Sequence, residues 1–263
     1  MAKPDRLPRP LLWLWRAVPL VLFGLVWQGV STSGLVNPAF LPPPRAVGAA
    51  LFDLLGGSQI RDNLLVTLYR SIAGLALGAI AGVLIGLLMA RSPRFNAYVA
   101  PIVGGTYSLP KAALVPLFIL WFGVGSVTAI CTVFLACLLP MIVQTFQGVV
   151  ATPKVLVWSA EAMGYTPRQL LTRVYLRHAL PDIMTGLRVA LGFSFVLALS
   201  SEMIAANSGI GKLIFMYGEN GAYDYMFAAI ACVVVVAYAA DRALVWLTRA
   251  SLHWHESAVE AAA

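Results

Sequence analysis

Two ionisable side chains, Lys111 and Glu202, stand within or at the end of long apolar runs. Charge inside a membrane is costly, so such groups are candidates for function. An ammonium at Lys111 near the membrane midplane would attract an anionic solute, and Tyr107 and Ser108, one turn away, would add hydrogen-bond donors. Alternatively, Lys111 extends to the membrane surface or forms a structural pair. Both interpretations stay open.

Glu202, in Ser200-Ser201-Glu202-Met203, allows a similar choice. It lines the outer gate of a solute path, or it belongs to a structural ion pair or a water-facing helix end. Arg70 and Asp241 lie near the ends of apolar runs and are predicted to be interfacial. No metal site and no nucleophile with a base is predicted from the three histidines, which are His178, His253 and His255.

Composition indicates the elements that must position these groups. Of the 263 residues, 60% are apolar and 11% charged, and the mean hydropathy is +0.84, which excludes an ordinary soluble domain. A helix needs about 20 mainly apolar residues to cross the hydrocarbon core. The runs are continuously apolar, so closed barrels do not fit. The sequence therefore predicts an all-α polytopic membrane protein with about six spans, at 14–32, 69–90, 99–122, 127–149, 184–206 and 225–247.

Orientation follows from the short loops, because Lys and Arg concentrate on the cytoplasmic side. We predict that both termini are cytoplasmic, with one tail over 1–13 and another over 250–263. In this orientation, 13 of the 18 Lys and Arg lie on the cytoplasmic side, four lie on the opposite side, and Lys111 lies in a span. The net charge of +7 is thus explained by topology, and we infer no nucleic-acid partner. The inside residues are Lys3, Arg6, Arg9, Arg16, Arg91, Arg94, Lys154, Arg168, Arg173, Arg177, Arg188, Arg242 and Arg249.

Glycine recurs every four residues in the second predicted span, at Gly74, Gly78, Gly82 and Gly86. On a helix this spacing forms one flat stripe, along which another helix can approach closely. The stripe is either a packing surface within the chain or an interface between subunits. Cys131, Cys137 and Cys232 lie inside predicted spans and are interpreted as packing residues.

The polar segment 151–182, predicted to be cytoplasmic, carries signals for two short helices. Thr152 with Pro153 predicts the start of the first helix, and Gly164 its end. Thr166 and Gln169 form a capping box for the second helix, which Pro181 is expected to close. Outside the membrane, 46–55 is predicted to be a short surface helix that docks a partner or covers the bundle.

The same segment resembles a known family. Trp158-Ser-Ala-Glu161-Ala-Met-Gly164-Tyr-Thr-Pro-Arg168 and Val174-Tyr-Leu-Arg-His-Ala-Leu180-Pro181 resemble the EAA loop of binding-protein-dependent transport permeases, roughly E-A-A-x-x-x-G, nine residues, then I-x-L-P. Two positions depart from it: Trp158 replaces the leading Glu, and Arg177 replaces the proline after Leu176. Phe40-Leu-Pro-Pro-Pro-Arg, Leu109-Pro-Lys-Ala-Ala-Leu-Val-Pro-Leu-Phe and Gly186-Leu-Arg-Val-Ala-Leu-Gly resemble the nitrate, sulfonate and taurine branch.

The resemblance implies a type I ABC importer permease fold over 14–249 in a bacterial inner membrane. It also implies a second copy of the chain, two copies of a separate cytoplasmic ATPase that binds ATP and Mg, and a periplasmic solute-binding protein. Alternating access would move a small anion such as a sulfonate, taurine or nitrate. The residues implied to dock the ATPase are Trp158, Glu161, Ala162, Gly164, Arg168, Val174, Leu176, Leu180 and Pro181.

This chain is not predicted to be an enzyme or to hold a cofactor. Gly209-Ile-Gly211-Lys212-Leu213 lacks the upstream glycine and the Ser or Thr of a phosphate-binding loop. Two other classes remain as alternatives. A secondary transporter or channel would need its own coupling-ion site, for which Glu202 is the one carboxylate close to a span interior. A membrane enzyme would need a cluster of His, Asp, Glu or Cys at one membrane face.

Overall fold

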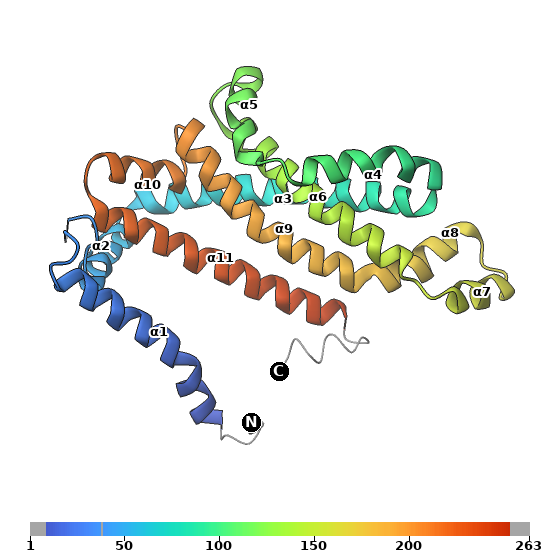
Figure 1. Ribbon diagram of the computed structural model, residues 1–263, viewed down its shortest axis with the longest axis horizontal. Helices are drawn as coiled ribbons and strands as arrows, with labels where there is room; N and C mark the ends of the chain where they lie inside the picture. The colour runs from blue at the N-terminus through green and yellow to red at the C-terminus, as the bar shows by residue number, and fades with distance from the viewer. Residues whose placement is uncertain (1–8, 38, 253–263) are drawn as a thin grey trace. The chain divides into compact units, whose positions relative to one another are not determined.

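The computed structural model describes residues 9–37 and 39–252, and these residues form helices and connecting turns without a strand (Figure 1). The fold class is therefore all-α. The helices are α1 (Arg9–Thr32), α2 (Pro44–Gly56), α3 (Ser58–Arg91), α4 (Pro93–Tyr107), α5 (Val115–Phe122), α6 (Ser126–Val150), α7 (Lys154–Ala162), α8 (Pro167–Leu170), α9 (Leu176–Ala205), α10 (Ile210–Glu219) and α11 (Tyr223–Ser251), with a 3₁₀ turn over Lys111–Leu114 and a π turn over Leu171–Tyr175.

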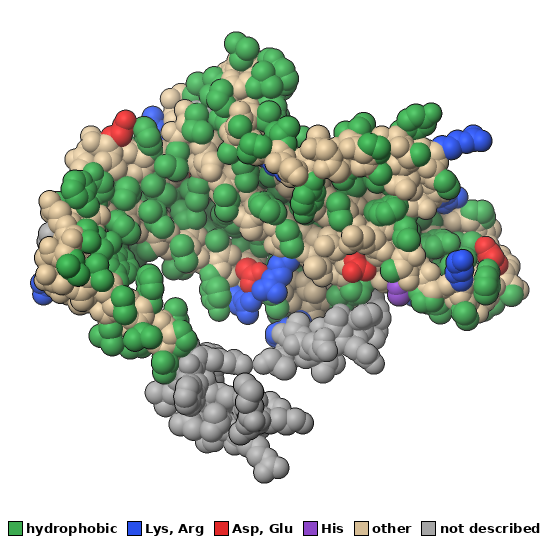
Figure 2. Space-filling view, viewed as in Figure 1, with side chains coloured by type: hydrophobic (Ala, Val, Ile, Leu, Met, Phe, Trp, Pro, Cys, Tyr) green, Lys and Arg blue, Asp and Glu red, His purple; other side chains and the backbone are tan. Residues whose placement is uncertain are grey.

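Within the described residues, four helices are long and apolar enough to cross a membrane, and the bent pair α4 and α5 makes five. The four are Ser58–Arg91, Ser126–Val150, Pro167–Ile204 and Tyr223–Ser251. The predicted first span lies on α1, whose part with described side chains, Val18–Thr32, is shorter than a crossing needs. Hydrophobic side chains cover most of the face seen in Figure 2, as lipid contact requires.

The segment 99–122, predicted as one span, is two helices that meet at an angle of 94°. The break lies where Pro110 has no N–H to donate to the helix. The chain turns through Ser108 and Leu109 into the 3₁₀ turn that begins at Lys111. The prediction of two spans separated by Gly123 and Gly125 agrees with a break there, because both glycines have positive φ, 76° and 148°.

The chain divides into two compact units. In the larger, Arg61–Leu213 with the residues from Val233 onward, α6 and α9 form the core together with α3. The glycine stripe packs within the chain. A Cβ added at Gly74 or Gly78 would stand only 2.6 Å from Val133 Cβ or 2.8 Å from Cys137 Cβ on α6, distances that real side chains do not reach. Gly82 and Gly86 meet Met141 and Thr145 in the same way.

The smaller unit holds the residues up to Ile60 and Ile214–Cys232. In it, α2 begins with Pro44 at its first position and ends before Gly57, close to the surface helix predicted over 46–55. The loop before α2 is fastened to α1, since Trp27 Nε1 donates to Pro42 O at 3.1 Å and Ser31 Oγ to Leu41 O at 2.7 Å. Tyr225 donates its hydroxyl proton to Asp53 Oδ2 at 2.7 Å.

Candidate functional site

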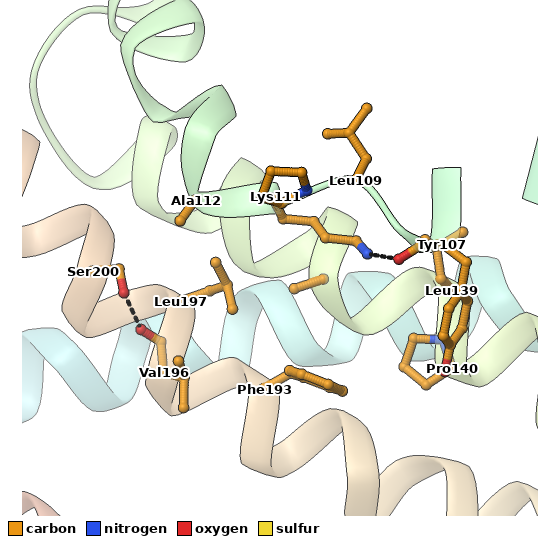
Figure 3. A pocket seen from close by; sticks show the side chains of 12 residues that line it. Tyr107, Leu109, Lys111, Ala112, Leu139, Pro140, Phe193, Val196, Leu197 and Ser200 are labelled. Atoms are coloured by element: carbon orange, nitrogen blue, oxygen red, sulfur yellow. Dashed lines mark hydrogen bonds between the residues drawn. The ribbon is translucent and has the colours of Figure 1, made fainter. Parts of the chain in front are cut away.

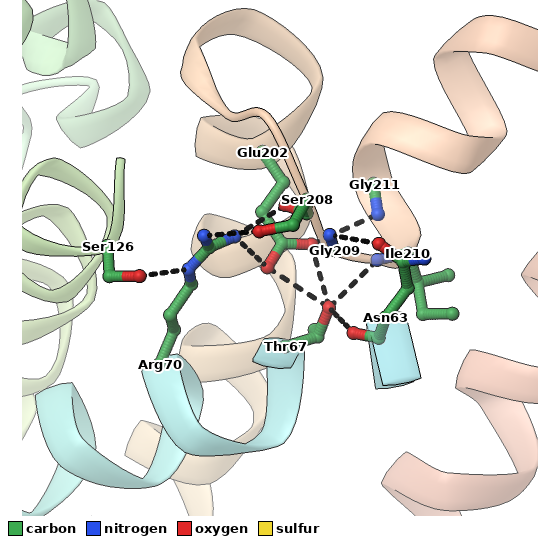
Figure 4. Close-up of polar contacts among 9 residues, drawn as sticks. All are labelled: Asn63, Thr67, Arg70, Ser126, Glu202, Ser208, Gly209, Ile210 and Gly211. Atoms are coloured by element: carbon green, nitrogen blue, oxygen red, sulfur yellow. Dashed lines mark hydrogen bonds and ion pairs between the residues drawn. The ribbon is translucent and has the colours of Figure 1, made fainter. Parts of the chain in front are cut away.

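A buried ion pair joins α3 to α9. Arg70 Nη1 lies 2.9 Å from Glu202 Oε1, and the two side chains are 2% and 0% exposed. Nη1 also donates to Ser208 O at 2.6 Å, Nη2 to Ser208 Oγ at 3.1 Å, and Nε to Ser126 Oγ at 3.1 Å. Four of the five N–H bonds of the guanidinium thus donate to partners from three segments (Figure 4).

The carboxylate of Glu202 is equally well satisfied. Thr67 Oγ1 lies 2.8 and 3.0 Å from its two oxygens, and the Gly211 N–H donates to Oε2 at 3.0 Å. The turn before α10 is held by the same group of side chains, because Ile210 N–H donates to Thr67 Oγ1 at 2.9 Å and Gly209 N–H to Asn63 Oδ1 at 2.6 Å. We call this set of residues the buried clamp: Asn63, Thr67, Arg70, Ser126, Glu202, Ser208, Gly209, Ile210 and Gly211.

The buried clamp corrects one prediction and bears on another. Arg70 is not interfacial, since it is enclosed by protein. The Glu202 carboxylate is fully buried in a structural ion pair, which was one of the interpretations left open for it. Burying charge is tolerated only when partners replace the lost water, and here they do. Asp241 pairs with Arg188 at 2.7 Å and with Arg242 at 2.8 Å, with its side chain 26% exposed.

Lys111 lies in different surroundings, on the wall of a cavity of about 340 Å³ (Figure 3). Its Nζ donates to Tyr107 O at 2.6 Å and stands 5.5 Å from the centroid of the Tyr107 ring. Tyr107 also lines this cavity, whereas Ser108 does not. The rest of the lining comes from the link before Lys111 and from α6 and α9: Leu109, Pro110, Ala112, Ala136, Leu139, Pro140, Phe193, Val196, Leu197 and Ser200.

A second, more apolar cavity of about 300 Å³ shares Leu109, Lys111 and Leu139 with the first. Its other walls are supplied by α3, α4 and α6. Two cavities therefore lie beside the break between α4 and α5. Sequence reasoning identified Lys111 and Tyr107 but missed the α9 wall, since Phe193 and Val196 are ordinary residues of an apolar span.

The segment predicted to dock an ATPase forms a compact arm, which we define as Lys154–Tyr175. Gly164, at φ 79°, ends α7 as predicted. The Gly164 N–H donates to Glu161 O at 2.9 Å and the Tyr165 N–H to Ala160 O at 3.1 Å, which is the Schellman pair of bonds. The start of α7 was predicted wrongly: Pro153 is its N-cap, and the Thr152 hydroxyl is buried without a partner.

The second half of the arm begins with the predicted capping box, in which Thr166 accepts from the Gln169 N–H at 3.3 Å and the Gln169 side chain accepts from the Thr166 N–H at 2.8 Å. Pro181 does not end this helix, contrary to the prediction. Helix continues from Pro167 to Ile204 through the π turn. The second half of the arm is thus the extension of a candidate membrane span and not a separate loop helix.

The other predicted docking residues lie on and below this arm. Glu161, Ala162 and Arg168 are exposed. Four large apolar side chains of the first half are also exposed, Val155 at 65%, Leu156 at 49%, Trp158 at 62% and Met163 at 67%. Val174, Leu176, Leu180 and Pro181 are half-buried along the second half and the start of α9. The arm therefore presents its docking candidates mainly from α7 and the turn that follows.

Neither the clamp nor the cavity supplies a metal centre. Across the part of the chain that the structure describes, no three His, Cys, Asp or Glu side chains group closely enough to hold an ion. His253 and His255 lie outside the described residues. All three cysteines are free, and Cys137 and Cys232 are buried.

Known proteins resemble this chain over most of its length. The taurine transport system permease protein TauC of Escherichia coli is 32% identical over 260 residues, covering 94% of each chain. The putative aliphatic sulfonates transport permease protein SsuC of Bacillus subtilis is 30% identical, covering 91% of this chain and 87% of its own. The formylaminopyrimidine transport permease protein ThiX of Halalkalibacterium halodurans is 32% identical and covers 71% and 74%.

The fold and a family pattern lead to the same assignment. A chain of the MetNI methionine ABC transporter, solved in inward-facing conformations, superposes with a TM-score of 0.66 at 20% identity, covering 73% of this chain and 96% of that one. Residues 74–252 match the pattern of one transport family. This range includes the clamp residues from α9 onward, the cavity and the arm. This chain belongs to the family of inner membrane components of binding-protein-dependent transport systems, with the type I ABC importer permease fold.

Proposed function

We propose that this permease subunit works as one of two identical copies, that a separate cytoplasmic ATPase holds its arm, and that its solute is a small organic anion. ATP and Mg bind to the ATPase and not to this chain. Alternating access then moves the solute inward after a periplasmic binding protein delivers it. The distribution of Lys and Arg supports a topology with both termini in the cytoplasm.

The observation that carries the docking proposal is the exposed apolar face of the arm. Val155, Trp158 and Met163 lie between two candidate membrane spans and outside both. Large apolar side chains on a water-facing element mark a surface that another protein covers. Tryptophan is frequent among the residues that dominate such interfaces. Trp158, at the position where the family pattern has glutamate, is therefore the expected anchor.

The solute proposal rests on two supports. The names of two relatives specify taurine and aliphatic sulfonates, and the cavity beside Lys111 combines one cation with apolar walls. A third relative carries the name of a pyrimidine, so membership of the family alone does not select the solute. An organic anion fits both supports best.

Co-purification tests the docking proposal. A tagged chain extracted from its native membrane is expected to bring an ATPase subunit with it. Trp158→Ala should weaken this recovery roughly tenfold or more, because a central tryptophan contributes about 2 kcal/mol or more. Trp121→Ala is the matched control, since Trp121 is 61% exposed but lies on α5, away from the arm.

Gly164→Val tests whether the shape of the arm matters, because a β-branched residue at φ 79° is strained. Gly56→Ala, at an ordinary φ with open space around it, serves as its control. Gly164→Val should uncouple ATP hydrolysis by the ATPase from transport, or it should abolish recovery of the ATPase. If the chain purifies alone and moves solute in ATP-free liposomes, it is a secondary transporter and the docking proposal is wrong.

Uptake measurements test the solute separately. Proteoliposomes that contain the whole complex and its binding protein should accumulate taurine or an alkyl sulfonate when ATP is supplied. If ATP drives uptake only of solutes that carry no sulfonate or other anionic group, the proposal of an anion fails while the docking proposal stands.

A further inference from the structure

The cavity beside Lys111 lies between the middle of α6 and the second half of α9. Ala136, Leu139 and Pro140 are near the middle of α6, and Phe193 and Val196 stand on the second half of α9. Both helices belong to candidate membrane spans, and a solute path must offer its contacts along such helices, since water is absent from the hydrocarbon.

Lys111 is the one charged residue among those that line this cavity, and the same holds for the neighbouring apolar cavity. Around the ammonium, the other groups of the first cavity are mostly hydrocarbon. Its two hydroxyl-bearing residues are Tyr107 and Ser200, and the Ser200 hydroxyl already donates to Val196 O at 2.8 Å. A negatively charged ligand in either cavity would therefore find one charged side chain on the cavity wall, that of Lys111.

The donors of Lys111 are only partly used. An ammonium carries three N–H bonds, and one donates to Tyr107 O at 2.6 Å. This bond spans the break between α4 and α5 and holds the ammonium at the cavity wall. Within the described part of the chain no carboxylate pairs with Lys111, in contrast to Arg70, Arg188 and Arg242. Two donors remain for a ligand.

We infer that Lys111 is the residue that contacts the charged end of the solute, and that the wall formed by Pro140, Phe193, Val196 and Leu197 takes the solute's apolar part. This inference rests on the proposed function, because it assumes that an organic anion passes through this chain. The volume of the cavity, about 340 Å³, is in the range of sites for small organic molecules. A charge-assisted bond to an anion is stronger than the bond to the neutral carbonyl, so the solute competes for the ammonium that Tyr107 now holds.

The first test is ATP-driven uptake of an alkyl sulfonate by the complete complex in proteoliposomes. Lys111→Met should lower the uptake rate at a subsaturating concentration of the sulfonate about ten- to a hundredfold, since one charge-assisted hydrogen bond is lost. Lys111→Arg should keep most of the uptake. Lys212→Met, which removes a lysine of α10 outside both cavities, should change nothing. Equal uptake by Lys111→Met and the unaltered complex would overturn the inference.

Chemical rescue separates a contact with the solute from a merely structural lysine. In a chain whose three cysteines are replaced by alanine, Lys111→Cys is alkylated with 2-bromoethylamine: an S–C bond forms, bromide leaves, the thiol proton passes to buffer, and the product has the length and charge of lysine. Uptake should return with this reagent but not with iodoacetamide, which adds a neutral group. Equal rescue by both reagents would show that the charge is not needed.

The proposed function and this inference fail in different ways. If the unaltered complex hydrolyses ATP without moving any anion, the proposed solute is wrong. If the unaltered complex moves an alkyl sulfonate and Lys111→Met does so equally well, only the role of Lys111 is wrong. The added alkyl sulfonate should also slow the alkylation of Lys111→Cys, whereas it should leave the labelling of Lys212→Cys unchanged.

Discussion

Arg70 and Lys111 are both cations on largely apolar helices of the larger unit, yet their surroundings are opposite. Arg70 is 2% exposed and donates to Glu202, Ser126 and Ser208. Lys111 is partly exposed beside two cavities and donates to one backbone carbonyl. Four of the five donors of Arg70 bond within the fold, whereas one of the three donors of Lys111 does.

This difference shows how charged residues with a structural role can be distinguished from charged residues with a functional role in a membrane protein. Both kinds of residue satisfy the rule that intramembrane charges deserve functional interpretation. Counting partners refines that rule. A buried pair with most of its donors bonded fixes the positions of helices, here α3 and α9 with the turn before α10, whereas a cation on a cavity wall with most of its donors unused is available to a ligand. Substitutions that act on stability at one site and on transport at the other test this distinction.

The largest effect on stability is expected from Arg70→Met. It leaves the Glu202 carboxylate buried without its counter-charge, which costs about 3 to 5 kcal/mol of folding free energy. Unfolding in detergent with increasing SDS measures the change. Adding Glu202→Met should recover a large part of the loss, because a pair of apolar residues tolerates burial. If the double variant is as unstable as Arg70→Met, the backbone bonds of the clamp matter more than its charges.

Gly209→Ala should come next. Gly209 has φ 114°, and an added Cβ would collide with the carboxyl group of Glu202. Gly221→Ala is the matched control, because Gly221 also has a positive φ, 71°, but open space around it. Overpacking typically costs about 1 to 3 kcal/mol. Gly209→Ala should therefore be less stable than Gly221→Ala by that amount in the same SDS titration, and equal losses would mean that backbone strain alone accounts for both.

A smaller loss is expected from Ser126→Ala, which removes the acceptor for Arg70 Nε on α6. Ser126 is only half-buried, so water can replace part of the bond, and the cost should be about 0.5 to 1.5 kcal/mol. Thermal melting of the purified chain is sensitive enough to detect it. A loss as large as that from Arg70→Met would show that the serine anchors the whole clamp.

The smallest effect on stability is expected from Lys111→Met, within about 0.5 kcal/mol of the unaltered chain. The same variant is expected to lose uptake strongly, so stability and transport separate at this position. A melting temperature far below that of the unaltered chain would instead place Lys111 with Arg70, as a structural residue, and remove the contrast between them.

Local and periodic features were predictable from the sequence. The stripe of glycines at Gly74 to Gly86, the positive φ at Gly164 and the capping box at Thr166 each depend on residues close together in the chain. The contact between α3 and α6 follows from the four-residue spacing of these glycines once α6 is known to be the partner helix. The prediction for Thr152 was wrong by one position because Pro153 takes the capping place. The prediction for Pro181 was wrong because α9 continues through this proline without the hydrogen bond that its missing N–H would have made.

The buried clamp was not predictable in the same way. Arg70 and Glu202 are 132 positions apart, and each by itself looked like the end of an apolar run. One signal was available: two opposite charges beside apolar runs, followed by Gly209 and Gly211, which leave room for a carboxylate. The 94° bend at Pro110 was also missed, because the apolar character of 99–122 continues through it.

The π turn at Leu171–Tyr175 has a mechanical consequence. It joins the second half of the arm to α9 without a gap, so Arg168 on the arm and Val196 on the cavity wall belong to one rod. At 1.5 Å per residue, the two are about 42 Å apart along the axis. A tilt of the rod by about 5° would displace one end relative to the other by about 4 Å, by plane geometry on that length. A lever of this length turns a small angular stroke at the arm end into a shift larger than a methyl group at the wall beside Lys111.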